Sequence, residues 1–366
     1  MKRLTLFGVL LTLGLFMSTP VFSYDYDVKI DGIYYDLTSD STACVTYSEL
    51  YAADYSGEVT IPTSINDNGK VYSVKGIGSQ AFYGCSGLTS VTIPNSVTRI
   101  GYQGFLGCSG LTSVTIPNSV KSIGEEAFCG CSGLTSVSIP KSIESISDYA
   151  FCGCSGLTSV KIPNSVTEIG MNAFSGCSGL TSVTIPNSVK SIDKEAFSGC
   201  SALTSVILGK SVTAISSTAF EDCGDIVFEV LSDAPLARLS ELNTKEIILG
   251  KGFEEMYITN WKEWTSFEKI YAKDSTPPVI SDSFSEYQKK NLQVIVPTEA
   301  LEAYKAAPVW KDFWLLEGGA ETAGVEGVTL PTADEDLPVY GLDGRRVKTT
   351  VPEHIYIKGG KKFVAQ

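Results

Sequence analysis

The stretch GCSGLTSVTIPNSV occupies residues 84–97 and returns unchanged at residues 107–120 and 176–189. Three further copies, at 130–143, 153–166 and 199–212, differ from it at only a few positions. Successive copies therefore begin every 23 residues, for example at 84, 107 and 130. A constant period in this range is typical of a solenoid, in which each copy forms one turn and covers the apolar edge of its neighbour.

The pattern inside one copy predicts a short strand followed by a turn. In the copy at 107–120, Val114 and Ile116 alternate with small polar residues, which is the period of a strand with one buried face. Pro117 cannot donate to a sheet and ends that strand. The later apolar positions are too irregular for a long helix and indicate turns with a short helical or 3₁₀ segment. The predicted fold class is a mainly β solenoid with parallel strands.

Two further residue types recur with the same period and predict ladders of stacked side chains inside the solenoid. The ladders consist of Phe82, Phe105, Phe128, Phe151, Phe174, Phe197 and Phe220, and of Cys85, Cys108, Cys131, Cys154, Cys177, Cys200 and Cys223.

The amino-terminal residues 1–23 have the layout of a secretory signal peptide. Lys2 and Arg3 precede an apolar run that is too short to span a bilayer, and Val21-Phe22-Ser23 is a cleavage site of small-residue type. No cysteine lies at that boundary, so a lipid anchor is not indicated. We expect a secreted or surface-displayed protein without membrane insertion.

Ten cysteines in an exported chain raise the question of disulfides. The Cys ladder favours buried free thiols, because a stacked column directs its sulfurs alike rather than toward each other. Cys129 and Cys152 lie outside that ladder, one period apart, and form the candidate disulfide. A metal site from these two and their ladder neighbours is disfavoured, because C-x-C is not the usual zinc spacing.

The phrase A-F-x-G-C-S-x-L-T-S-V-x-I-P-x-S-V-x-x-I resembles the BspA-like leucine-rich repeat of bacterial cell-surface proteins, over roughly residues 26–316. Gly104 departs from the usual Ala before Phe, and Leu208-Gly209 replaces Ile-Pro. The resemblance implies a leucine-rich repeat fold, location at the cell surface or outer-membrane exterior, and adhesion to a host matrix protein, a host cell or a neighbouring bacterium.

The chain divides into successive sections on these grounds. After the signal peptide we predict an amino-terminal cap with the first repeat at 24–80, regular repeats at 81–223, degenerate closing repeats at 224–316, a linker at 317–337 and a small β tail at 338–366. The tail has turns at Asp343-Gly344 and Gly359-Gly360. It is similar to the sorting domain of the type IX secretion route, although His354 departs from that pattern.

Composition argues against catalysis and against nucleic acid as a partner. The net charge of −13 repels polyanions. The single histidine, His354, leaves histidine-based hydrolases and metal sites without a base or ligand. Paired carboxylates such as Glu125 with Glu126, or Asp193 with Glu195, occupy variable surface positions and are better explained as solvated charges. We expect no enzyme activity, no cofactor and no metal.

The remaining function is a binding module for an extracellular protein, with glycan binding or self-association into a surface scaffold as alternatives. All four tryptophans, Trp261, Trp264, Trp310 and Trp314, lie in the closing section. They are interpreted as cap-core aromatics, with a sugar-stacking patch as the alternative.

Two columns of variable residues are candidate recognition surfaces. On the outward side of the strands the serines Ser90, Ser113, Ser136, Ser159, Ser182 and Ser205 do not vary. Beside them lies the candidate strand-face column Thr92, Thr115, Ser138, Lys161, Thr184 and Ile207, which we expect to be exposed. The alternative candidate lies on the loops and consists of Tyr102, Glu125, Glu126, Tyr149, Met171 and Lys194.

Overall fold

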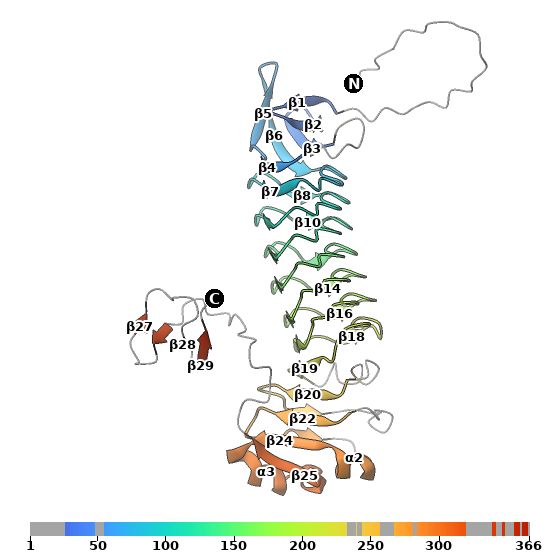
Figure 1. Ribbon diagram of the computed structural model, residues 1–366, viewed down its shortest axis with the longest axis vertical. Helices are drawn as coiled ribbons and strands as arrows, with labels where there is room; N and C mark the ends of the chain where they lie inside the picture. The colour runs from blue at the N-terminus through green and yellow to red at the C-terminus, as the bar shows by residue number, and fades with distance from the viewer. Residues whose placement is uncertain are drawn as a thin grey trace, which may run out of the picture.

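The computed structural model describes residues 26–47, 55–232, 239, 244–256, 267–280 and 284–319, and the backbone of four strands between 339 and 364. The chain winds into an elongated β-solenoid with the amino-terminal cap at one end and the closing section at the other (Figure 1). The signal peptide, Trp261, Trp264 and His354 lie outside the described residues.

The first ladder contains the predicted strands, which pair in parallel at a spacing of one turn. Ser113 lies opposite Ser136, and Val114 opposite Val137. The ladder is divided into two hydrogen-bonded sheets between β13 and β15. Its members are β4 (Gly57–Thr60), β7 (Leu88–Thr92), β9 (Ser113–Thr115), β11 (Ser136–Ser138), β13 (Ser159–Lys161), β15 (Ser182–Ile185), β17 (Ser205–Leu208), β19 (Val227–Val230), β20 (Glu246–Leu249), β22 (Lys269–Ala272), β24 (Gln293–Pro297) and β25 (Leu315–Gly319).

The second ladder was not predicted from the sequence. It consists mainly of two-residue strands, each of which follows the turn after a strand of the first ladder, and they also pair in parallel, as Ile123 does with Ile100. Its members form three hydrogen-bonded groups. The first contains the end of β6 (Lys70–Ile77), β8 (Arg99–Ile100) and β10 (Ser122–Ile123), the second contains β12 (Ser145–Ile146), β14 (Glu168–Ile169), β16 (Ser191–Ile192) and β18 (Ala214–Ile215), and the third is the pair β21 (Glu255–Met256) and β23 (Val279–Ile280).

The return segment of each turn differs in detail from the expected helical or 3₁₀ piece. Its backbone makes separate turns, each closed by a hydrogen bond from residue i+3 to residue i. Examples are the bonds from Leu106 N to Gln103 O (3.1 Å) and from Cys108 N to Phe105 O (3.2 Å). Positive φ angles at Gln103 (54°) and Gly107 (74°) interrupt any continuous helix. The same two positions have positive φ in the neighbouring regular turns.

The core contains the predicted pair of ladders together with buried leucine, valine, isoleucine and alanine residues of each turn. Consecutive phenylalanine rings from Phe82 to Phe220 are stacked, with centroids 4.8 to 5.4 Å apart. Each ladder thiol after the first donates a hydrogen bond to a phenylalanine carbonyl of the preceding turn, as Cys131 Sγ does to Phe105 O (3.2 Å). These bonds satisfy a buried carbonyl and join the turns to each other.

The amino-terminal cap closes the stack with aromatic residues. It contains β1 (Val28–Ile30), β2 (Ile33–Leu37), β3 (Thr42–Thr46) and β5 (Ser64–Asp67), with β3 parallel to β6. Tyr55 accepts a hydrogen bond from Tyr34 N (3.0 Å) and donates one to Thr46 O (2.9 Å). Its ring lies 4.7 Å from that of Phe82, so the cap packs directly on the phenylalanine stack.

The closing section contains helical elements, including α2 (Glu286–Asn291), η3 (Thr298–Ala300), α3 (Leu301–Ala306) and η4 (Trp310–Asp312). Trp310 is fully buried, and its indole Nε1 donates to Pro278 O (2.8 Å), as expected for a cap-core aromatic. Trp314 departs from that expectation, because it is 72% exposed.

Two boundaries can be compared with the structure. The closing section extends to Gly319 rather than ending at 316, because β25 pairs with β24 through Glu317 and Gly319. In the tail, β26 (Val339–Gly341) pairs with β27 (Arg346–Val347) and with β28 (Ile355–Lys358), which pairs in turn with β29 (Lys361–Val364). These antiparallel strands flank the two predicted turns.

Candidate functional site

The candidate strand-face column is brought into line by the parallel register. Thr92 lies opposite Thr115, which lies opposite Ser138, and Ser138 lies opposite Lys161. Thr184 lies opposite Ile207 on the far side of the break between β13 and β15. The invariant serines form a parallel column two residues earlier in each strand.

Five members of this column, Thr92, Thr115, Ser138, Lys161 and Thr184, are exposed, but Ile207 is not. Its exposed fraction is 9%, which contradicts the expectation that it projects into solvent. The neighbouring position in β19 is Glu229, whose side chain is itself only 15% exposed and pairs with Lys273 at 2.7 Å. The outward side is thus partly covered from β17 into the closing section, and Ile207 belongs to that covered region.

A third column on this side was missed by the sequence analysis. It consists of the exposed threonines at the amino-terminal ends of the strands. The hydroxyls of Thr112, Thr135, Thr158 and Thr204 donate to the carbonyl of the threonine one turn earlier, as from Thr112 Oγ1 to Thr89 O (3.3 Å) and from Thr158 Oγ1 to Thr135 O (3.2 Å). The signal was present, since Thr precedes Ser-Val in all six copies. We use the term strand face for the outward serines, the threonines at the amino-terminal ends of the strands, and the five exposed column members.

The loop candidate separates into two adjacent columns. One column contains Tyr102, Glu125, Met171 and Lys194. Glu126 and Tyr149 occupy the next, in which each turn from Gln80 to Glu195 has a positive φ (55° at Glu126 and at Tyr149). Glu126 accepts a hydrogen bond from Gln103 Nε2 at 2.8 Å, and Gln103 accepts one from Gln80 at 2.7 Å. These polar side chains therefore bond to one another from turn to turn.

The suggested carboxylate pairs do not converge in the structure. The Glu126 carboxylate accepts a hydrogen bond from Gln103 Nε2. The Glu195 carboxylate, in a different turn, accepts one from Asn172 Nδ2 (3.1 Å). The Asp193 carboxylate accepts from Lys194 N at 2.7 Å. Each carboxylate thus supports the local backbone or its own column.

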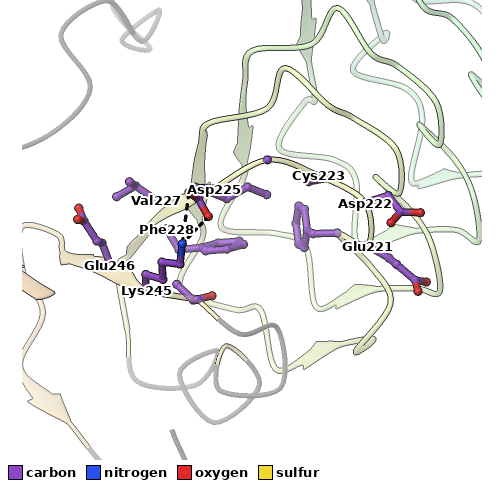
Figure 2. Close-up of a pocket in the computed structure, with 12 residues that line it drawn as sticks. Glu221, Asp222, Cys223, Asp225, Val227, Phe228, Lys245 and Glu246 are labelled. Atoms are coloured by element: carbon purple, nitrogen blue, oxygen red, sulfur yellow. Dashed lines mark hydrogen bonds and ion pairs between the residues drawn. The ribbon is translucent and has the colours of Figure 1, made fainter. Parts of the chain in front are cut away.

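A recess of about 470 Å³ lies where the regular period ends, and it was not foreseen (Figure 2). The register shortens there, because Ser205 lies opposite Val227, 22 residues later. The phenylalanine stack ends at the same place, since Phe228 meets Phe220 edge-on, at an interplanar angle of 82°. The rim is mainly acidic and contains Glu221, Asp222, Asp225, Lys245 and Glu246.

Figure 2 shows Lys245 and Asp225 facing each other on one side of the recess, with Glu221 and Asp222 on the other. Lys245 Nζ lies 3.1 Å from Asp225, and Glu246 pairs with Lys269 at 3.3 Å. Two of the four carboxylates are thereby neutralised within the protein. The recess follows from the change of period and carries no arrangement of groups that indicates a ligand.

Within the part of the chain that the structure describes, no group of three or more His, Cys, Asp or Glu side chains is arranged to hold a metal ion. Among the same residues, no helix combines the length and apolar character that crossing a bilayer requires.

The repeats match a family model described as the BspA type leucine rich repeat region. Six copies of it align over residues 63–178 and 121–233. The chain is also 31% identical to a leucine-rich repeat protein of T. pallidum and covers 87% of that protein's chain. The chain belongs to the BspA-type leucine-rich repeat family. Members of this family are surface proteins and are typically non-catalytic.

Solved structures of several bacterial proteins are similar to this chain. The T. pallidum protein covers 51% of this chain with a TM-score of 0.43. A leucine rich cell surface protein of Faecalibacterium prausnitzii is 23% identical, with coverage of 82% of this chain and 95% of its own and a TM-score of 0.36. The pneumococcal vaccine antigen PcpA is 14% identical, with coverage of 80% and 96% and a TM-score of 0.31. No curated protein matches the chain.

Proposed function

We propose that this protein is a secreted or surface-displayed binding module that recognises an extracellular protein through its strand face. The observation that carries the proposal is the strand face itself. Its hydroxyls lie in register on consecutive turns, and those of the threonines at the amino-terminal ends of the strands are fixed by bonds to the backbone, as at Thr135 and Thr158. A rigid polar surface of this kind costs little conformational entropy to bind against.

The expected ligand is an extended polar segment, such as part of a host matrix protein or of another bacterial surface protein. Adjacent strands lie about 4.8 Å apart, so an extended segment that runs across them meets a hydroxyl of each column at that interval. Lys161 distinguishes the face by adding a cation to a row of small hydroxyls, and so favours a ligand with an acidic group at that point.

Glycan binding remains the second candidate because the closing section exposes two large aromatic side chains. Trp314 is 72% and Tyr287 is 70% exposed, and Lys290 Nζ lies 5.1 Å from the Trp314 ring centroid. Exposed aromatic rings stack on the apolar faces of sugars. Self-association into a surface scaffold is the third candidate.

The test compares binding of the full mature chain to immobilised matrix proteins, to a glycan array and to itself. Two variants each change the net charge by −2 on opposite candidates, Thr115→Glu with Ser138→Glu on the strand face and Tyr102→Ala with Lys194→Glu on the loops. A third variant, Trp314→Ala, tests the aromatic patch. Ile207 is left intact because its burial would confuse binding with folding.

We expect the strand-face variant to weaken binding to a protein ligand at least fivefold, about the 1 kcal/mol that marks a meaningful interface residue. The loop variant should leave it unchanged. Loss of binding in the loop variant alone would move recognition to the loops. Sugar binding that depends on Trp314, or self-association without a foreign ligand, would replace the proposal with the corresponding alternative.

We also propose that residues 338–366 direct the protein to the cell exterior as a type IX sorting signal. The support is the short Tyr-Gly-Leu-Asp-Gly and Gly-Gly-Lys-Lys pattern, carried by two pairs of antiparallel strands.

A further inference from the structure

Cys129 and Cys152 differ from every other cysteine of the regular turns in their position. Each directly follows a stacked phenylalanine, in a column that holds Leu106 in the turn before and Ser175 in the turn after. The two cysteines therefore occupy equivalent places in consecutive turns. This column was singled out by the sequence, and the proposed binding function makes no use of it.

The backbone brings the two residues to disulfide distance. Backbone hydrogen bonds join the turn that contains Cys129 to the turn that contains Cys152. They come from the residues before and after Cys129, from Phe128 N to Ala150 O (2.8 Å) and from Gly130 N to Cys152 O (2.6 Å). The adjacent rings of Phe128 and Phe151 have centroids 5.4 Å apart. Segments paired in this way are about 4.8 Å apart, and disulfides need Cα atoms between about 4.4 and 6.8 Å.

The environment of the pair also differs from that of the Cys ladder. Cys131 and Cys154 are fully buried, and their thiols donate to the carbonyls of Phe105 and Phe128, both at 3.2 Å. Cys129 and Cys152 are only half-buried. Hydrogen bonding between their two thiols lowers the pKa of Cys152 to about 7, against the opposing effect of burial, and raises that of Cys129. Accessible thiols with a lowered pKa are the reactive ones.

We propose that Cys129 and Cys152 are a thiol–disulfide exchange site that closes into an inter-turn disulfide when the protein meets an external disulfide. The Cys152 thiolate attacks one sulfur of the disulfide RS–SR, whose S–S bond breaks, and RS⁻ leaves and takes up a proton. Cys129 then loses its proton and attacks Cys152 Sγ in the mixed disulfide, releasing the second RS⁻. Two protein thiols are oxidised and one external disulfide is reduced to two thiols.

The bond would close a loop of one turn in the middle of the solenoid, between β9 and β13. A cross-link of this size restricts the unfolded chain and so raises the unfolding temperature of the oxidised protein. Reduction returns the protein to its starting state, which makes the modification reversible.

The experiment treats the full, reduced chain with oxidised glutathione under native conditions, alkylates it in denaturant, and measures the intact mass and the cross-linked peptide. We expect eight alkylated thiols (10 − 2) of the ten cysteines, with the missing two joined in one peptide pair containing Cys129 and Cys152. The unfolding temperature should rise on oxidation and return to its starting value with reductant.

Two single variants separate the roles of the pair. Cys129→Ser should stop at one glutathione adduct on Cys152, because the resolving thiol is gone, and Cys152→Ser should react much more slowly. A transplanted pair, Ser175→Cys with Ser198→Cys in a chain carrying Cys129→Ser and Cys152→Ser, should cross-link again if the column geometry is responsible. Ten alkylated thiols after treatment, stable double adducts in the native chain, or a cross-link within the Cys ladder would each overturn the proposal.

Discussion

The rings of Phe128 and Phe151 lie parallel to within 2°, with their centroids 5.4 Å apart. Both side chains are completely buried, and each ring is stacked on a further phenylalanine on its other side. Every ring in the middle of this column is therefore supported from both directions by an identical side chain. Substituting one of these phenylalanines therefore removes ring contacts on both of its sides.

Replacing Phe151 with alanine is expected to lower the free energy of unfolding by about 3–5 kcal/mol, because it removes a buried ring and leaves a cavity in the stack. Phe151→Leu should cost less, since it retains much of the apolar volume. Urea unfolding followed by circular dichroism measures both, with exposed Glu125→Ala as the control. Equal stability of the alanine variant and the parent would show that the stack is dispensable.

Deleting residues 107–129, one full period, should leave a folded solenoid that is shorter by one turn, about 5 Å. The new neighbours find the same partners in the same register, because bonds between regular turns repeat every 23 residues. Small-angle scattering and circular dichroism measure length and fold. Removing only residues 107–118 should unfold the protein, since it places strand residues opposite turn residues; survival of that half-period deletion would contradict this account.

Gly130→Ala is expected to cost about 1–2 kcal/mol because Gly130 has a φ of 72°, a region that residues with a Cβ enter with difficulty. Space is not the obstacle, since an added Cβ would lie 3.5 Å from Gly107 Cα, an ordinary contact. Gly130→Asn, with the same Cβ but a better tolerance of positive φ, should cost less. If both variants lose the same stability in chemical unfolding, the backbone conformation is not the cause.

Stability should decrease as the pH rises above about 9. Burial raises the pKa of Cys177 to about 12, and burial likewise raises that of Tyr35 to about 12. The folded state thus holds these protons more tightly than the unfolded state. Their contribution is complete below the unfolded pKa values and is lost as pH approaches the folded values.

Urea titrations at pH 7, 9 and 10.5 measure this loss. Cys177→Ser should retain the hydrogen bond to Phe151 O while removing the titration, and its stability should depend less on pH. A parent protein whose stability is constant up to pH 10.5 would contradict the assignment of buried, protonated thiols.

Removing residues 338–366 should reduce surface display while leaving the unfolding temperature of the solenoid unchanged. The four strands of the tail pair only among themselves in the structure, so the solenoid sheets lose no partner. Fractionation of cells and thermal unfolding measure the two effects. Normal display of the truncated chain would leave the tail without a sorting role.

The regular part of the fold could be predicted because its signals repeat. Alternation at Val114 and Ile116 located the first ladder, and the shared period of Phe and Cys located the core. The second ladder was missed because strands of two residues, such as Ser122–Ile123, are too short to show alternation. The positive φ at Tyr149 and at Glu126 could not be predicted either, because neither Tyr nor Glu has a preference for that conformation.

The candidate site was predictable only where the period holds. The column from Thr92 to Lys161 is in register and exposed, but its role in binding remains a prediction. Ile207 was misjudged because its neighbour Glu229 lies beyond the last regular copy, where the spacing to Lys273 cannot be read from the repeat. The recess beside Phe228 was missed for the same reason.

The hydrogen bond from each ladder thiol to a carbonyl of the preceding turn also bears on how such a gene can change. In the regular turns the thiol and its acceptor are separated by 26 residues, and the backbone bonds on the same side reach the following turn, so every turn depends only on its immediate neighbours. An in-frame duplication of one 69-nucleotide unit anywhere in this region would encode a turn that finds its partners already in place. Unequal recombination between the near-identical copies can thus lengthen or shorten the protein without passing through an unfolded product, whereas the two caps, which have no second copy, are fixed.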